Sequence, residues 1–112
     1  MKTLLFISRH RATPSQRALA AAQEYSLLES EDLDAFAPLA DLNRRMDAIK
    51  ADGHFGVVVV HPVIALVAHL AGLAVGVFQN ANRAAVGETP RFEAVSLLVF
   101  PQRRFPQAKS DV

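Results

Sequence analysis

Two short apolar runs, each followed by a proline-marked helix start, constrain the fold of this chain more than any other feature. Residues 3–7 read TLLFI and residues 57–60 read VVVV, and neither run contains a charge or a turn residue. Continuous apolar runs of this length are typical of strands buried on both faces of a parallel sheet. Because parallel strands need crossover connections, the sequence predicts an α/β protein with helices on both faces.

Both helix starts carry capping signals. Thr13 is a favourable N-cap, Pro14 suits the first helical position, and Gln16 stands where a capping box needs it. The pair His61-Pro62 starts another helix directly after the second apolar run. These signals indicate where two strands end and where the helices that follow them begin.

The predicted order of elements is β-α-β-α-β-α-β-β. The connection before the last strand has no helical pattern, which allows that strand to pair antiparallel. The predicted fold is an open, mainly parallel Rossmann-like sheet of about five strands with helices on both faces. The predicted strands are 3–7, 25–28, 57–60, 74–78 and 93–100, and the predicted helices are 14–22, 38–51 and 62–71.

Length and composition limit the possible classes of protein. A chain of 112 residues, 51% of them hydrophobic, fits one domain, expected over residues 1–100 with a flexible tail at 101–112. The absence of cysteine excludes a disulfide framework and a thiolate metal site or nucleophile. A formal net charge of +1 predicts no strong attraction to duplex nucleic acid or an anionic membrane. Without a signal-like or membrane-spanning run, we expect a cytoplasmic protein.

The chemistry is expected at the carboxyl ends of the strands. In an open α/β sheet of order 2-1-3-4, the ligand crevice lies between strands one and three. Ser8, Arg9 and His10 follow the first strand and His61 follows the third, so these residues should face one another. The two helix N-termini nearby would attract an anion through free backbone N–H groups. The sequence therefore predicts a phosphate site in which Arg9, His10 and His61 carry the chemistry.

Further polar side chains extend this candidate site. Arg11 adds positive charge, and Thr13 lies on the same connection. The polar end of the fourth strand is expected next along the rim, although its residues are equally suited to Asx-type turns. This strand end comprises Asn80, Asn82 and Arg83. The structural alternative for the site is that a histidine caps a helix and Arg9 meets a surface carboxylate.

Other motifs predict no cofactor and no metal. The chain has no glycine-rich phosphate loop and no histidine–carboxylate spacing suited to a metal ion. His69 lies in the middle of an apolar helix and is interpreted as structural, whereas His54 stands beside Asp52-Gly53 and is interpreted as a turn residue. The helix over 62–71 is apolar nearly all round, so we expect a homodimer that uses this helix or the edge of the last strand.

Two segments resemble the small CARF-like ring nucleases of type III CRISPR systems. FISRHRATPSQ, residues 6–16, resembles the strand-Arg-His opening of some of these proteins. VVVVHPVIALVAHLAG, residues 57–72, resembles their later strand, proline-marked turn and apolar helix. The resemblance implies a homodimer that binds and cleaves cyclic oligoadenylate in a symmetric cleft. Arg9 and His10 would hold a phosphate and stabilise the transition state while a ribose 2′-hydroxyl attacks.

The same segments resemble, more locally, the histidine phosphatase superfamily. In that family the first strand ends in Arg-His-Gly, and a later strand ends in a second histidine. The resemblance implies that His10 is the nucleophile for a phosphoryl group, with Arg9 and His61 stabilising its oxygens. This chain has Arg11 in place of the glycine, and only residues 11–60 separate the two histidines. A third interpretation is a binding or interaction protein without catalysis, carried by a mobile element or prophage.

Overall fold

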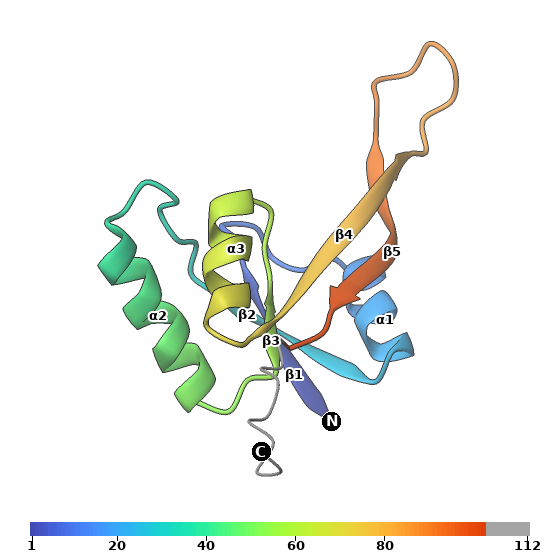
Figure 1. Cartoon of the computed structure of the whole chain (residues 1–112). Coiled ribbons are helices and arrows are strands. Elements are labelled where there is room, and N and C mark those ends of the chain that lie inside the picture. The colour runs from blue at the N-terminus through green and yellow to red at the C-terminus, as the bar shows by residue number, and fades with distance from the viewer. Residues whose placement is uncertain (103–112) are drawn as a thin grey trace, which may run out of the picture.

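The sheet follows the order expected from the sequence. The computed structural model describes residues 1–102, and its five strands are arranged as β2-β1-β3-β4-β5 (Figure 1). The strands β2, β1, β3 and β4 are parallel neighbours, and β5 pairs antiparallel with β4, which confirms the predicted α/β fold. The elements are β1 (Lys2–Ile7), α1 (Pro14–Ala22), β2 (Tyr25–Ser30), α2 (Leu39–Ala51), β3 (Gly56–Val58), α3 (Pro62–Leu70), β4 (Ala74–Asn82) and β5 (Phe92–Phe100).

Each face of the sheet carries its own hydrophobic core. Leu5 and Ile7 of β1 pack under α2 and α3, whereas Leu4 and Phe6 pack on the face covered by α1. Alternate residues of a strand point to opposite faces, so a strand covered on both sides must be apolar throughout. This is the physical reason for the unbroken run at residues 3–7.

The third strand is shorter than the sequence suggested. It spans Gly56–Val58, whereas residues 57–60 were the predicted strand. Val59 is still buried and its N–H donates to the carbonyl of Gly76 at 3.3 Å, but the side chain of Val60 is 88% exposed. The chain thus leaves the sheet at its last valine, and that valine is free to face solvent beside the start of α3.

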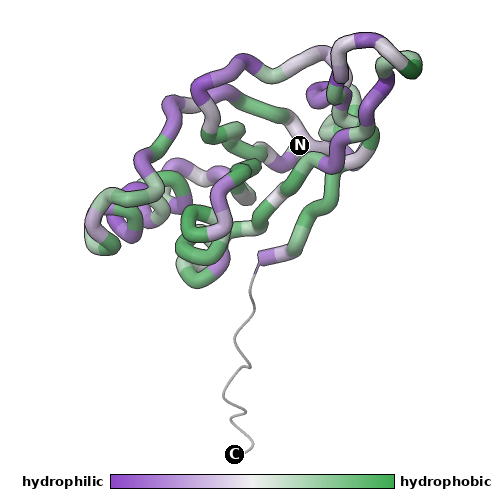
Figure 2. Tube along the Cα trace, turned by 90° about the horizontal axis from the view of Figure 1, so that it is seen from above, coloured by the Kyte–Doolittle hydropathy of each residue, from purple (hydrophilic) through white to green (hydrophobic). Residues whose placement is uncertain are grey.

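The fourth strand is longer than predicted, because β5 pairs with it as far as Asn82. The two strands leave the body of the protein together as an arm (Figure 1). Hydrophobic residues follow β4 and β5 where they lie near α3, and polar residues prevail farther out along the arm (Figure 2). Polar side chains after Phe78 therefore mark the point where the pair of strands leaves the core, not the end of the strand.

Within the described residues, no helix has the length and hydrophobicity needed to cross a membrane. The tail expected at 101–112 falls outside the described residues from 103 onward. Gln102, which does lie within them, donates a hydrogen bond from Nε2 to the carbonyl of Phe55 at 3.0 Å.

Candidate functional site

A crevice opens at the carboxyl ends of β1 and β3, where the strand order reverses. Arg9 and His10 line it from the connection after β1, and His61 lines it from the start of α3. Its volume is about 610 Å³, and the loop after β2 contributes Asp32 to the wall. The structure therefore brings together the three residues to which the sequence assigned the chemistry, at the edge where open α/β sheets bind ligands.

Side chains hold the connection between β1 and α1 in shape. The hydroxyl of Ser8 accepts a hydrogen bond from the backbone N–H of His10 at 3.0 Å. Glu29 Oε2 accepts another from the N–H of Ala12 at 3.0 Å, and Glu29 Oε1 lies 3.2 Å from Arg17 Nη2. Ser8 thus lines the crevice and also fixes the turn that presents Arg9 and His10.

The N-terminus of α1 is closed by its own cap. Thr13 Oγ1 accepts from the N–H of Gln16 at 3.1 Å, and Gln16 Oε1 accepts from the N–H of Thr13 at 2.9 Å. This reciprocal pair is the capping box that the sequence predicted. Thr13 does not line the crevice. One of the two helix N-termini expected to attract an anion therefore already uses its polar groups internally.

His61 is both a helix cap and a wall of the crevice. Its Nδ1 accepts a hydrogen bond from the N–H of Val63 at 3.1 Å, and the ring of Phe36 meets it edge-on at 6.0 Å. We assign the neutral tautomer from this bond, because an accepting Nδ1 leaves the ring proton on Nε2. In this state the Nε2–H of His61 is a hydrogen-bond donor, which suits contact with an anion and does not suit proton abstraction.

The charge around the crevice is mixed. A second hollow of about 650 Å³ lies beside the same connection, where Arg9 and Arg11 meet the acidic end of β2 and the residues after it. Asp32 lines both hollows. The acidic residues of the second hollow are Glu29, Glu31 and Asp32. An anionic ligand would therefore bind against Arg9 and His10 and away from the carboxylate of Asp32.

The polar residues of β4 do not line the crevice. Asn80 is paired with β5 on the arm, and Asn82 Oδ1 accepts from the N–H groups of Ala84 and Arg91 at 3.0 and 3.1 Å. Arg83 Nε lies 3.9 Å from Glu93 Oε2. Asn82 thus makes the Asx-type turn contacts to which its residue type is suited, and it does not lie on the rim of the crevice.

The loop between β2 and α2 supplies crevice residues that are not among those predicted from the sequence. Asp32 lines the crevice, and Phe36 contacts His61 although its own side chain is 88% exposed. One signal was available: β2 is the other neighbour of β1, so its carboxyl end lies at the same edge of the sheet. The acidic run that follows it could have been placed beside Arg9 on that ground.

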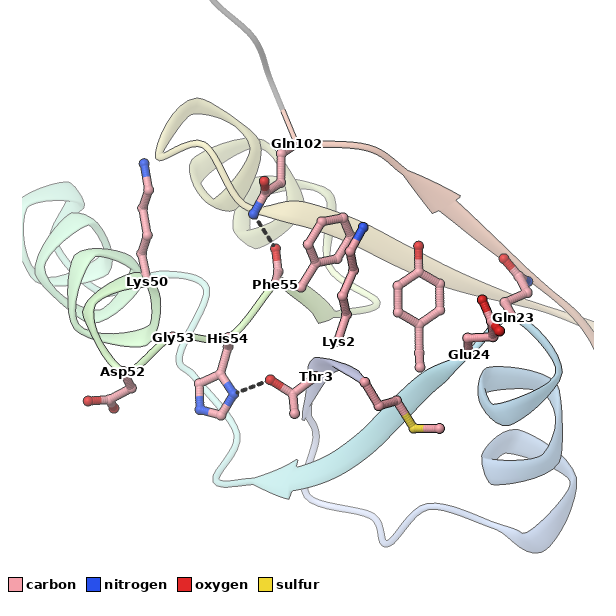
Figure 3. Close-up of a pocket in the computed structure, with 12 residues that line it drawn as sticks. Lys2, Thr3, Gln23, Glu24, Lys50, Asp52, Gly53, His54, Phe55 and Gln102 are labelled. Carbon is pink, nitrogen blue, oxygen red and sulfur yellow. Dashed lines mark hydrogen bonds between the residues drawn. The ribbon is translucent and has the colours of Figure 1, made fainter.

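A larger hollow, of about 1220 Å³, lies at the opposite end of the parallel strands, where β1, β2 and β3 begin (Figure 3). Several of its polar groups are already paired with one another. Thr3 Oγ1 and His54 Nδ1 are 3.0 Å apart, and Gln102 binds the carbonyl of Phe55. The ammonium of Lys2 stands 4.3 Å from the centre of the Phe55 ring. We therefore place the candidate site at the carboxyl ends of the parallel strands, where the strand order reverses and the connections after β1 and β3 line the crevice.

Among residues 1–102, no group of three histidine, aspartate, glutamate or cysteine side chains is placed to hold a metal ion. Comparison of the chain with protein-family models, with curated proteins and with solved structures gave no match. The function therefore has to be inferred from the residues of the crevice.

Replacing His61 separates its structural role from its role in the crevice. His61→Ala should lower the free energy of unfolding by about 1 kcal/mol, because the N–H of Val63 loses its cap. His61→Asn should keep most of that stability, since asparagine is a favourable N-cap, but it removes the Nε2 donor. Urea unfolding measures the first effect and phosphate-ligand titration the second. Equal stability of the two variants would contradict the capping role.

Proposed function

We propose that the crevice binds a phosphodiester, that the ligand is a cyclic oligoadenylate, and that the protein cleaves it as a metal-independent ring nuclease. The observation that carries the proposal is the convergence of Arg9, His10 and His61 on one crevice at the reversal of strand order. The Arg9 guanidinium, the Nε2–H of His61 and the imidazole of His10 suit an anion that has several oxygens.

Binding would rest first on the Arg9 guanidinium. Charge-assisted N–H···O bonds to phosphate are stronger than bonds between neutral groups, and guanidinium can make two in parallel. The Nε2–H of His61 would donate to another oxygen of the same phosphate. The apolar residues of the crevice that are at least partly exposed, Leu33, Ala35 and Pro62, would contact the nucleoside.

Cleavage would use the ribose 2′-hydroxyl next to the bound phosphate. The 2′-oxygen forms a bond to phosphorus, the bond from phosphorus to the 5′-oxygen breaks, and a 2′,3′-cyclic phosphate results. His10 would take the proton from the 2′-hydroxyl while a solvent water protonates the leaving 5′-oxygen, or His10 would protonate the leaving oxygen while water accepts the 2′-proton. Arg9 would stabilise the charge that develops on the phosphoryl oxygens. The proposal places this activity in the cytoplasm.

One observation favours the alternative of binding without catalysis. Arg9 and His10 are both exposed, and within residues 1–102 no hydrogen bond or ion pair orients either side chain. Catalytic groups generally need neighbours that lock their geometry, whereas electrostatic binding tolerates mobile ones. If this alternative holds, the protein binds a phosphate ligand and releases it unchanged.

The full chain should be incubated with a panel of cyclic oligonucleotides and the products separated by chromatography. The proposal expects a linear product with a 2′,3′-cyclic phosphate end, formed in the presence of a metal chelator. A ligand that binds and is recovered intact would favour the alternative. Turnover of a simple phosphate monoester would instead support the histidine phosphatase resemblance.

Removing the carboxylate from the crevice should strengthen binding. Asp32→Asn keeps the size of the side chain and removes a negative charge beside Arg9 and His10. Affinity for a cyclic oligonucleotide at low salt should rise by about 3- to 10-fold, because repulsion between exposed charges is modest and screened. Asp41→Asn on α2, outside the crevice, is the matched control. Weaker binding by Asp32→Asn would show that this carboxylate holds part of the site in place.

A further inference from the structure

The face of the sheet that carries α2 and α3 is left partly uncovered at β5. Strands β4 and β5 are joined by a hairpin and not by a crossover helix, and among the described residues the helix packed on β5 is α1, on the other face. Leu98 and Phe100 pair with Val77 and Val75, whose side chains belong to the core under α2 and α3. Leu98 is 44% exposed and Phe100 is 54% exposed as a result.

One flank of α3 is apolar and exposed as well. Val63, Leu66 and Leu70 are spaced three and four residues apart, so they form a single stripe, and they are 44%, 58% and 53% exposed. Ile64, Val67 and Ala68, on the other side of the helix, are buried in the core. The α3 segment between residues 62 and 71 contains no charged residue. Hydrophobic residues of α3 lie beside those of β4 and β5 in Figure 2.

Together these side chains form what we call the α3–β5 patch. Its members are Phe36, Val60, Val63, Leu66, Leu70, Leu98 and Phe100. From these exposed fractions the seven residues present on the order of 800 Å² in all, about the area that one partner buries in a standard protein–protein interface. None of the seven is charged. The central part of a homodimer interface is likewise poorer in charged residues than the rest of a protein surface.

We propose that the α3–β5 patch is the interface between two copies of this chain, related by a two-fold axis next to α3. The patch combines the exposed apolar stripe of α3 with the part of β5 that no helix covers on this face of the sheet. In an isologous pair, α3 of each copy can contact α3 of the other and cover its Leu98 and Phe100. The second copy thus supplies the helical cover that the β4–β5 hairpin omits.

This interface would also bring the two crevices to one side of the dimer. Val60 belongs to the patch and lines the crevice, so the interface ends at the crevice rim. Two crevices related by the axis would form a cleft with two-fold symmetry. The inference of the interface stands on burial and topology alone, and only the shared cleft rests on the proposed function.

Sedimentation equilibrium of the full chain tests the interface independently of any ligand. We expect a dimer at micromolar concentration. Leu66→Glu should weaken dimerisation by at least about 100-fold, because a carboxylate would be buried without a partner. Its side chain is already largely exposed in one chain, so circular dichroism should show an intact fold. Leu28→Glu, at an exposed leucine of β2, is the matched control and should remain dimeric.

Cross-linking locates the axis, and the lack of native cysteine makes single substitutions informative. Leu66→Cys should form a covalent dimer with a short bis-maleimide, whereas Val95→Cys on the edge strand should not. A wild type that sediments only as a monomer, or a Leu66→Glu variant that remains dimeric, would overturn the proposal. Cross-linking through Val95→Cys alone would assign the interface to the edge of β5, and loss of the dimer in Leu28→Glu would assign it to β2.

Discussion

Replacing His10 by alanine is expected to slow cleavage of a cyclic oligonucleotide by about 100- to 10,000-fold, the range for loss of a positioned acid or base. Binding should change far less, because the proton transfer takes place only in the transition state. The rate at saturating ligand and the dissociation constant, measured separately, distinguish the two effects. A loss of affinity as large as the loss of rate would show that His10 serves mainly to bind.

Arg9→Ala should behave differently from His10→Ala. Under the proposed function the guanidinium would contact phosphate in the ground state and in the transition state alike, so binding and cleavage should weaken together, by about 10- to 100-fold in affinity. Arg44→Ala is the matched control, because Arg44 pairs with Asp41 on the exposed side of α2. If the wild type and both crevice variants alike leave every phosphate substrate uncleaved, binding without catalysis is the surviving interpretation.

The phosphatase alternative gives a third outcome for the same variants. A nucleophilic His10 would form a phosphoenzyme from a phosphate monoester, and His10→Ala would abolish it. The ring-nuclease proposal expects monoesters to remain intact and no phosphoenzyme to form. Because both proposals use the crevice, only the identity of the substrate and the covalent intermediate separate them.

The strand order and the place of the crevice could be predicted because the constraints that produce them are local in sequence. A run such as TLLFI has to be covered on both faces, and the helix starts at Pro14 and Pro62 fix where the connections lie. Handedness and strand pairing in parallel sheets then allow few topologies. Arg9 and His61 line the same crevice because both follow neighbouring parallel strands, β1 and β3, at the carboxyl ends of those strands.

The arm could not be predicted from the same kind of pattern. Polar residues after Phe78 normally mark the end of a buried strand, but a pair of strands outside the core has solvent on both faces and tolerates them. The strand continues because β5 supplies its partner, and that partner is distant in sequence. Asn80 and Arg83 were therefore expected at the rim of the crevice, whereas the structure carries them away on the arm.

That His61 both caps α3 and lines the crevice could not be predicted from its position in the sequence. The pair His61-Pro62 predicts either a histidine that caps a helix or a histidine that lines the ligand site, and the sequence does not indicate that one side chain does both. The bond from Val63 to Nδ1 shows that capping uses one ring nitrogen and leaves the other for the crevice. Which nitrogen caps the helix depends on the rotamer of His61, and no pattern of residue types encodes that choice.

Gly56→Ala is expected to lower the free energy of unfolding by about 3 kcal/mol or more, at the upper end of the cost of overpacking a core. Gly56 is buried in β3 and pairs with Leu4 and Ala74 in the neighbouring strands. A Cβ at this position would stand 2.7 Å from Ala74 Cβ and would overlap the Ala74 carbonyl oxygen as well. These atoms belong to a strand held by hydrogen bonds, so no side-chain rotation can relieve the overlap.

Gly53→Ala provides the matched control for that substitution. Gly53 has φ of +88° and no atom within 4 Å of an added Cβ, so alanine there costs only the backbone strain of about 1–2 kcal/mol. Urea unfolding of both variants gives the comparison, and an equal loss in the two would mean that β3 and β4 separate readily. Because His61 follows β3 by three residues, forcing β3 away from β4 should also displace one wall of the crevice. Folded Gly56→Ala protein is therefore expected to bind a phosphate ligand more weakly than folded Gly53→Ala protein does.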